Sequence, residues 1–403
     1  MDAKPRGPFR ILMVAPTSFF GHYGGHIRIL EEAKALQNLG HHVTIVTYSM
    51  GQDVAGLDIR RTARLPYHAD YQVGSSRHKI AFDLYLLVKV LQVGLRLRPD
   101  IIHGHMHEGA LIGGLLGRLL GRPLVFDFQG SLTGEMLDHH FIRGGGLRYR
   151  FFWQLEHFIC HLPQAILISS LRAENLLRQQ FGVRPEQIYP LPDCADLDHF
   201  NPANISPAAK ATLRQQLQIP AGRPIAAYLG LLADYQGTHH LVEAAALLKQ
   251  SGREVHFLIM GYPNEEQYRQ QAENLGVADR VTFTGRVDYA RDAPRFLSLG
   301  DVALAPKISA SEGSGKVLNY MAMGQPVVAY DNPVHHEYLG EWGVYVPAGD
   351  LVALSQAIIT LLDDPQRRQM LGQQLHQRAA THFGWAPAGA KIAEWYGRLI
   401  RNN

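Results

Sequence analysis

Five consecutive residues, Glu312 to Lys316, are of types that suit binding of a sugar attached to phosphate. Gly313 and Gly315 flank Ser314, and glycines let a backbone approach a ligand closely. The free amides that open a helix favour an anion, and Lys316 adds a full positive charge. Glu312 can accept hydrogen bonds from hydroxyl groups. The simpler alternative is a strand-to-helix turn in which Ser314 only caps the helix.

The flanking sequence predicts how these residues are positioned. A short apolar run, Val302–Ala305, precedes them, an apolar helical pattern follows, and Pro326–Val328 begins another apolar run. This order is that of a strand, a glycine-rich turn, a helix and a second strand. Ligands of open parallel sheets bind outside the carboxyl ends of the strands, where such a turn lies.

A second glycine pair stands near the beginning of the chain. Gly24 and Gly25 end a loop and lead into a helical pattern that also contains His26 and Arg28. Backbone amides at the start of a helix can bind phosphate, although a tight loop with no ligand explains the same glycines. We expect Gly24 and Gly25 to contribute to phosphate binding.

Several histidines could suggest a metal. His103, His105 and His107 alternate with other residues at the end of a predicted strand, but the local sequence supplies no carboxylate partner. We therefore expect no metal there, and we expect His105 to contact the acceptor or tune the site. His335 and His336 are expected at the surface or as helix caps.

Length and composition set broad limits. The 403 residues predict two or three domains, and a net charge of +3 does not favour nucleic acid as a partner. The two cysteines, Cys160 and Cys194, lack metal spacing and predict buried, reduced thiols in a cytoplasmic chain. Neither Ile11–Ala15 nor Ala110–Phe126 reads as a signal peptide or a membrane span, which predicts a soluble or peripheral protein.

Short β-type runs alternate with amphipathic helices along the whole chain, which favours parallel sheets covered on both faces. The alternation is interrupted at Pro190–Pro207, a segment rich in proline, Asp and Asn, and then restarts. The fold class is therefore α/β, with two Rossmann-like doubly wound units that face each other across a cleft. The chain has neither a G-x-G-x-x-G motif after a strand nor a Walker sequence, which disfavours dehydrogenases and P-loop NTPases.

Six short motifs follow one another along the chain: LQNLGHHVTIVT, PDIIHGH, CADLDHFNP, FTGRV, MAMGQPVV and VPAGD. In their order and spacing, these motifs resemble those of the retaining GT-B glycosyltransferases of family 4. The resemblance implies an N-terminal acceptor domain (1–193), a C-terminal donor domain (194–381) and a helix that crosses back (382–403). It also implies transfer of a sugar from a nucleotide diphosphate to a hydroxyl group, without metal or cofactor.

Three departures from the family pattern concern charge. The first family glutamate is matched approximately by Glu312, which would contact the sugar, and the second, a ribose ligand, is replaced by Asn319. Two family cations that bind pyrophosphate are replaced by Leu231 and Gln236. Because Lys307 and Lys316 flank the glycine turn, we expect them to have taken over phosphate binding.

The resemblance also implies roles for other residues. Gln129 replaces a family histidine close to the reacting carbon, and Asp127 precedes it by two residues. The reaction of such enzymes relies on positioning and electrostatic stabilisation more than on a general base. Together with Glu312 and His105, these two residues form the catalytic candidates. His26 and Arg28 are expected on the acceptor side. The nucleotide pocket is expected to comprise Gly261, Tyr262, Arg286 and Val287.

Fewer residues indicate which acceptor the protein uses and where in the cell it acts. Arg143, Arg148 and Arg150 lie next to the aromatic run Phe151–Trp153, which suits either an ordinary amphipathic helix or contact with anionic lipid. The implied acceptor is a carbohydrate or a lipid-linked sugar, in the cytoplasm or at the inner face of a membrane. The alternatives are a transferase that uses a phosphosugar donor without a nucleotide, or a non-catalytic carbohydrate-binding protein of the same fold.

Overall fold

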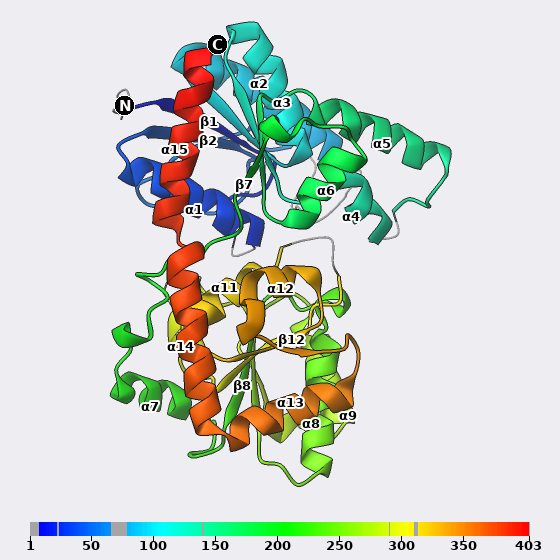
Figure 1. The fold of residues 1–403 in the computed structure, drawn as a ribbon, viewed down its shortest axis with the longest axis vertical. Helices are drawn as coiled ribbons and strands as arrows, with labels where there is room; N and C mark the ends of the chain where they lie inside the picture. The colour runs from blue at the N-terminus through cyan, green and yellow to red at the C-terminus, as the bar shows by residue number, and fades with distance from the viewer. Residues whose placement is uncertain are drawn as a thin grey trace.

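The computed structural model of the protein describes residues 8–21, 24–65, 79–138, 141–289, 291–309 and 313–402. Within these residues, two parallel β-sheets with flanking helices form an N-terminal unit and a C-terminal unit, which lie above one another in Figure 1. The predicted α/β class with two doubly wound units is confirmed.

The N-terminal sheet has seven parallel strands in the order β3-β2-β1-β4-β5-β6-β7. They are β1 (Arg10–Ala15), β2 (His42–Thr47), β3 (Asp58–Arg61), β4 (Ile101–His105), β5 (Leu124–Phe128), β6 (Ala165–Ile168) and β7 (Ile188–Pro190). The order reverses between β1 and β4, so the carboxyl ends of β1, β4 and β5 meet at one edge of the sheet. The candidate residues Asp127 and His105 lie there, on neighbouring strands.

Helices cover both faces of this sheet. They are α1 (Gly24–Asn38), α2 (Lys79–Leu97), α3 (Met106–Leu120), α4 (Leu132–Asp138), α5 (Leu147–Cys160) and α6 (Leu171–Gln179). Side chains alternate along a strand with period two. Ile11 and Met13 of β1 therefore pack with α1, whereas Leu12 and Val14 pack with α2 and α3 on the other face.

The C-terminal sheet has six parallel strands in the order β10-β9-β8-β11-β12-β13. They are β8 (Ile225–Leu229), β9 (His256–Met260), β10 (Val281–Phe283), β11 (Val302–Ala305), β12 (Val327–Tyr330) and β13 (Val344–Val346). Its helices are α7 (Pro207–Gln216), α8 (Thr238–Gln250), α9 (Glu265–Asn274), α10 (Ala293–Leu297), α11 (Gly315–Ala322), α12 (Pro333–Leu339), α13 (Leu351–Asp363) and α14 (Pro365–His382). The order reverses between β8 and β11, which places the glycine turn after β11 at the switch point.

The last helix, α15 (Trp385–Asn402), continues from α14 and lies against α1 of the N-terminal unit (Figure 1). Its buried side chains Ile392 and Tyr396 belong to the core between α1 and the N-terminal sheet. The chain thus connects the two units twice, once through the proline-rich segment after β7 and once at Gly384, which pairs with Ala195.

The sequence did not predict the short strands β3, β7 and β13, each of which lies at an edge of its sheet. Strand β3 has the sequence DIRR, in which only one residue is apolar. A single neighbouring strand and a polar surface leave such a segment without the apolar pattern on which strand prediction depends. Both cysteines are buried and free, as predicted.

Candidate active site

The glycine turn follows β11 and leads into α11. Its predicted sugar ligand, Glu312, lies outside the described residues, whereas Gly313, Ser314 and Gly315 are described. Ser314 is buried, and its hydroxyl lies 3.1 Å from Nε2 of His335, whose Nδ1 lies 2.8 Å from the carbonyl oxygen of Tyr330. This buried histidine therefore connects Ser314 of the glycine turn to the end of β12 through hydrogen bonds.

His335 is fully buried, so its expected place at the surface is wrong. Burial, followed by the positive charges of Lys316 and Lys307, lowers the pKa of His335 to about 4. The ring is therefore neutral near pH 7. Its Nδ1 can then donate to the Tyr330 carbonyl while Nε2 accepts from the Ser314 hydroxyl.

Lys316 reaches Gln236, one of the two positions at which the resemblance implies a cation. Its Nζ lies 2.7 Å from Oε1 of Gln236 and 3.0 Å from the hydroxyl of Tyr228, and 4.4 Å from the centre of the Tyr228 ring. A β-carbon on Gly230 would lie 2.9 Å from the same Nζ, so the glycine makes room for the ammonium. Lys316 thus brings a positive charge to the carboxyl end of β8, beside a position that is itself uncharged.

Lys307 lies between β11 and the glycine turn, and Asn319 lies in α11 after Lys316. Lys307 is buried, and its Nζ donates to the carbonyl oxygen of Gly313 over 2.9 Å. Asn319 is buried in α11, one turn after Lys316. A second cation therefore holds the backbone of the turn from the side of β11.

The predicted nucleotide-pocket residues follow β9 and β10. The amide of Gly261 donates to the carbonyl of Gly285 over 3.0 Å, and a β-carbon on Gly261 would collide with the carbonyl oxygen of Gly230. The guanidinium of Arg286 lies 5.4 Å from the ring centre of Tyr262, whereas Val287 is part of the core. The residues that follow β8, β9 and β10 are therefore closely packed, and Lys316 contacts the first of these three segments at Gly230.

On the N-terminal unit, Gly24, Gly25 and His26 form the first turn of α1. His26 is buried, its Nδ1 accepts from the amide of Gly21 over 2.7 Å, and its Nε2 contacts the hydroxyl of Thr17. A β-carbon on Gly25 would lie 3.0 Å from Oε1 of Gln129. Gly25 therefore lies against the segment that carries the catalytic candidates, whereas a β-carbon on Gly24 would have no neighbour within 4 Å.

Asp127 is the centre of a buried polar network. Arg28 donates to both of its carboxylate oxygens over 2.8 to 3.0 Å, Gln129 donates over 2.7 Å, and Nδ1 of His105 lies 3.1 Å away. Burial alone would raise the pKa of Asp127, but Arg28 and His105 hold it far below the usual range. The carboxylate is thus ionised and cannot serve as a general acid.

Arg28 also pairs with Glu32 over 3.1 Å and with Asp193 over 2.9 Å. Burial alone would lower the pKa of Arg28, yet Asp127, Glu32 and Asp193 together raise it well above the usual value. Burial, together with the charge of Asp127, raises the pKa of Glu32. Arg28 is almost inaccessible to solvent and its nitrogens are occupied by carboxylates, so its direct effect is to hold Asp127 in place.

Two histidines and two carboxylates of this network could also bind a cation. One ligand atom from each of Glu32, His103, His105 and Asp127 lies within 4.8 Å of all the others. The expectation that these histidines lack a carboxylate partner is therefore wrong, because the tertiary structure supplies two. The guanidinium of Arg28 contacts both carboxylates, and so already provides positive charge at this position.

Asp193 connects the two units. Besides Arg28, its carboxylate accepts from the hydroxyl of Tyr338 in α12 over 3.4 Å. A β-carbon on Gly313 would lie 2.5 Å from its Oδ2, so the glycine turn is in close contact with this carboxylate. The Arg28–Asp127 network and the glycine turn are therefore adjacent, with Asp193 between them.

The sequence analysis did not identify Asp193, His335 or Glu32. Glu32 follows Arg28 by four residues on a predicted helix, a spacing that could have indicated the pair. Asp193 stands in a proline-rich linker and His335 in an ordinary helix, and neither has a local pattern that indicates its partners.

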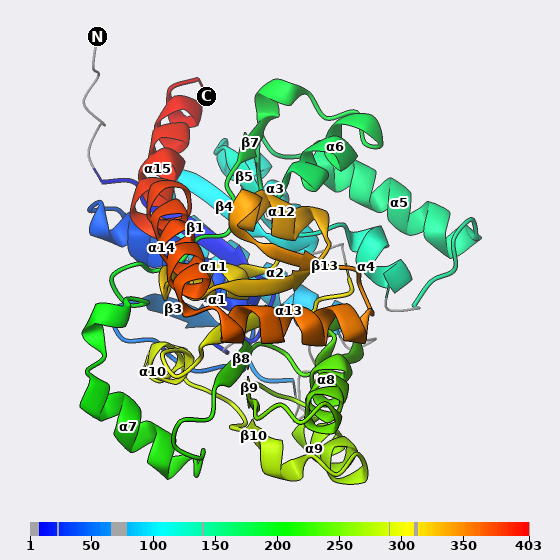
Figure 2. The same cartoon turned by 60° about the horizontal axis from the view of Figure 1, so that its bottom comes forward.

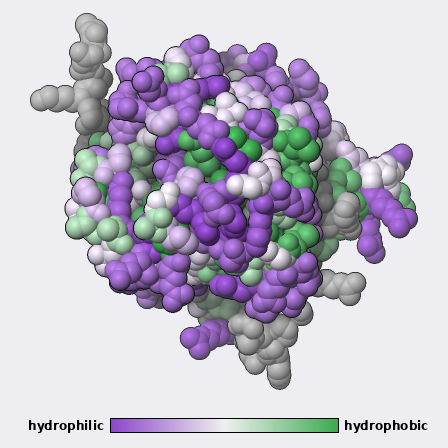
Figure 3. All heavy atoms as spheres, turned by 90° about the horizontal axis from the view of Figure 1, so that it is seen from below, coloured by the Kyte–Doolittle hydropathy of each residue, from purple (hydrophilic) through white to green (hydrophobic). Residues whose placement is uncertain are grey.

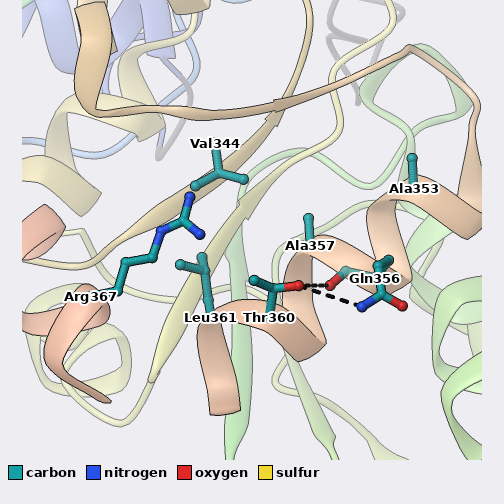
Figure 4. Close-up of a pocket in the computed structure, with 7 residues that line it drawn as sticks. All are labelled: Val344, Ala353, Gln356, Ala357, Thr360, Leu361 and Arg367. Carbon is teal, nitrogen blue, oxygen red and sulfur yellow. Dashed lines mark hydrogen bonds between the residues drawn. The ribbon is translucent and has the colours of Figure 1, made fainter. Parts of the chain in front are cut away.

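The structure also contains a pocket of about 310 Å³ between β13, α13 and α14 (Figure 4). Apolar side chains such as Val344 and Leu361 line it, and Arg367 extends over it. A second pocket of about 300 Å³ lies near Asp301 and Arg368. The residues that line these two pockets include none of the predicted site residues.

Comparison with known proteins identifies two family matches. Residues 209–378 match the family "Glycosyl transferases group 1", and residues 24–194 match "Glycosyl transferase 4-like domain". Among curated proteins, the chain is 30% identical over 254 residues to an alpha-D-kanosaminyltransferase of Streptomyces kanamyceticus, covering 61% of this chain and 63% of the relative. It is 28% identical over 270 residues to the putative glycosyltransferase EpsD of Bacillus subtilis, covering 65% of this chain and 68% of EpsD. The aligned part thus spans about two thirds of these relatives or less.

Solved structures show the same fold over nearly the whole chain. Sucrose-phosphate synthase of Thermosynechococcus elongatus superimposes with a TM-score of 0.81 at 20% identity, covering 99% of this chain and all of that one. HepE of Anabaena, solved in complex with UDP-glucose, superimposes with a TM-score of 0.77 at 19% identity, covering 97% of this chain and all of HepE. With the two family matches covering most of its length, this chain belongs to the group 1 glycosyl transferases and has the GT-B fold.

Proposed function

We propose that this glycosyltransferase moves a sugar from a nucleotide diphosphate to a hydroxyl group of a carbohydrate or a lipid-linked acceptor, with retention of configuration. The observation that carries the proposal is the adjacency of two sites at the carboxyl ends of the sheets. A glycine turn with two lysines contacts Asp193, and Asp193 contacts the Arg28–Asp127 network.

The donor would bind to the C-terminal unit. Lys316, Lys307 and the amides of Gly313 and Gly315 would offset the negative charge of the phosphates. Lys316 supports this role because its ammonium lies beside Gln236, at the place of a family cation. Asn319 would bind the ribose, and Glu312 the sugar hydroxyls, as the resemblance implies. Gly261, Tyr262, Arg286 and Val287 would form the base pocket.

The acceptor would bind to the N-terminal unit. Gln129 and His105 are held by Asp127, and Gly25 lies against Gln129, so that Gly24 and Gly25 would bind the donor phosphates from this side. Because Asp127 is ionised and already paired, its contribution would be electrostatic, through the orientation of Gln129 and His105. The departing phosphate would itself take the proton of the acceptor hydroxyl, a mechanism that requires accurate positioning.

Relatives support both partners. HepE was solved with UDP-glucose, and a relative in Mycolicibacterium smegmatis is a GDP-mannose-dependent alpha-(1-6)-phosphatidylinositol monomannoside mannosyltransferase, 30% identical over 213 residues that make up 51% of this chain. We infer from these names that the donor carries a nucleotide and that a lipid-linked acceptor would suit this chain. None of the described helices is long and apolar enough to cross a bilayer. A lipid-linked acceptor would thus require peripheral contact with the inner face of a membrane.

The experiment is a thermal-shift screen of the full chain with UDP, GDP, ADP and their sugars, followed by hydrolysis of the stabilising donor. Stabilisation by one nucleotide and slow release of its sugar would support the transferase. Stabilisation by free sugars with no effect of any nucleotide would instead support a carbohydrate-binding protein without turnover.

The replaced cations favour one alternative donor. Leu231 and Gln236 stand where relatives are expected to bind pyrophosphate, so a phosphosugar without a nucleotide remains a second candidate. Stabilisation by a sugar 1-phosphate, with none by the nucleoside diphosphates, would distinguish it in the same screen.

A further inference from the structure

Three helices of the N-terminal unit form one outer layer. α3 packs against α2 on one side and α5 on the other, and together they cover the face of the sheet opposite α1 and α15. Figures 1 and 2 both show α5 extending outward beyond the rest of the molecule. The outward side of this layer, which we call the α2–α3–α5 surface, has no partner within the described chain.

The α2–α3–α5 surface carries most of the exposed large hydrophobic side chains of the described chain. On α2, Ile80, Leu84 and Val88 are 71%, 59% and 56% exposed, at successive intervals of four residues. The opposite side of the same helix is buried in the core. Leu119 of α3 is 62% exposed and Phe151 of α5 is 61% exposed. By contrast, Figure 3 looks onto the C-terminal unit and shows a mostly hydrophilic surface with small hydrophobic patches.

The charges of this surface have one sign. The three helices contain only three acidic residues, and each is turned inward: Asp83 accepts from Tyr48, Glu108 pairs with Lys79, and Glu156 accepts from Thr133. In contrast, Arg96, Arg118, Arg148 and Arg150 are exposed. Apolar side chains interspersed with arginine, without exposed acid, suit an anionic lipid surface.

We propose that the α2–α3–α5 surface docks on the face of an anionic lipid bilayer, with its leucine, isoleucine and phenylalanine side chains in the headgroup region and its arginines on lipid phosphates. A second copy of the chain is a poorer occupant, because joining two such surfaces would bring arginines against arginines. The proposal rests on the proposed function in one respect only, since a lipid-linked acceptor would give the docking its use.

The test is sedimentation of the full chain with vesicles of phosphatidylcholine alone and vesicles that also contain phosphatidylglycerol. We expect binding to the anionic vesicles only, and weaker binding as salt is added. The double variant Leu84→Gln/Val88→Gln should bind at least about tenfold more weakly, because two apolar side chains are lost from the buried area. Val352→Gln changes a 72% exposed valine on α13 and is the matched control, which should bind like the wild type.

Charge reversal by Arg148→Glu/Arg150→Glu gives a second test that leaves the apolar side chains in place, and it should abolish binding to the anionic vesicles. Absence of wild-type binding to anionic vesicles would overturn the proposal. Binding of both double variants as tight as that of the wild type would overturn it as well. A dimer in analytical ultracentrifugation that the variants dissociate would overturn it in favour of a second copy.

The nucleotide screen separates this proposal from the transferase function. Vesicle binding without any nucleotide effect would refute the nucleotide-dependent transferase and leave the membrane surface intact. Nucleotide binding without vesicle binding would refute the membrane surface alone.

Discussion

Replacement of Lys316 by methionine tests whether this residue has taken over phosphate binding. The change keeps the length of the side chain and removes its charge from the place beside Gln236 and Tyr228. A hydrogen bond to a charged group contributes about 1.5–3 kcal/mol. Since about 1.4 kcal/mol corresponds to a factor of ten, Lys316→Met should weaken binding of the nucleoside diphosphate by about 10- to 150-fold.

A second substitution should restore binding. Gln236 lies 2.7 Å from the ammonium of Lys316, so a lysine at position 236 can place its charge in the same region. We therefore expect Lys316→Met/Gln236→Lys to bind the nucleotide within about fivefold of the wild type, because the charge-assisted bond is regained. Rescue at this position would show that charge, rather than shape, is what Lys316 contributes.

Isothermal titration with the nucleotide found in the thermal-shift screen measures both effects. Lys249→Met is the control, because it removes a lysine from the last turn of α8 that pairs with Asp279 on the surface. If folded Lys316→Met binds the nucleoside diphosphate as tightly as the wild type does, the assignment of Lys316 to the phosphates is refuted.

Three further changes test the supporting structure. Arg28→Met leaves the carboxylates of Asp127 and Glu32 buried without their cation, so urea denaturation should show a loss of about 3–5 kcal/mol in the free energy of unfolding, and a loss below about 1 kcal/mol would contradict the network. The folded-state pKa of His335, about 4, lies below its unfolded value of 6.5, so stability should be lost as the pH falls from 6.5 to 4, by about 3 kcal/mol for this group. His335→Gln should flatten that part of the pH profile of the melting temperature, and an unchanged slope would argue against this pKa. Asp193→Asn weakens the contact between Arg28 and the glycine turn, and should raise the donor KM by about tenfold with a smaller change in kcat, whereas equal changes in both would point to a general loss of structure.

The central strands and most helices of both units could be predicted from the sequence. The sequence predicts strands over 101–105, 124–128, 225–229 and 302–305, and these are the bounds of β4, β5, β8 and β11, because each is a short run with clear breaks on either side. The sequence also predicts a helix over 110–120, but α3 begins at Met106, because the polar residues of its first turn do not show the apolar period. The edge strands were missed for related reasons: β3 is mostly polar, whereas β7 and β13 have only three residues each, too few to show a period.

The candidate site could be predicted only where its residues are neighbours in sequence. Gly313, Ser314, Gly315 and Lys316 were found together because a strand, a glycine turn and a helix follow one another along the chain. Asp193 could not be found in this way, because its partners Arg28 and Tyr338 are 165 and 145 residues away. Its importance depends on how the N-terminal and C-terminal units come together in the folded chain.

The sequence by itself determined the fold class, the position of the glycine turn and the uncharged residues at positions 231 and 236, because periodicity, glycine spacing and residue type are local properties. Only the tertiary structure decided which charged groups lie beside these positions and which hold other side chains in place. It brought Lys316 to Gln236, surrounded Arg28 with carboxylates and placed His335 beneath Ser314. These relations depend on distances between strand ends and helices that are remote in sequence, and burial together with the neighbouring charges then sets the ionisation of Arg28 and His335.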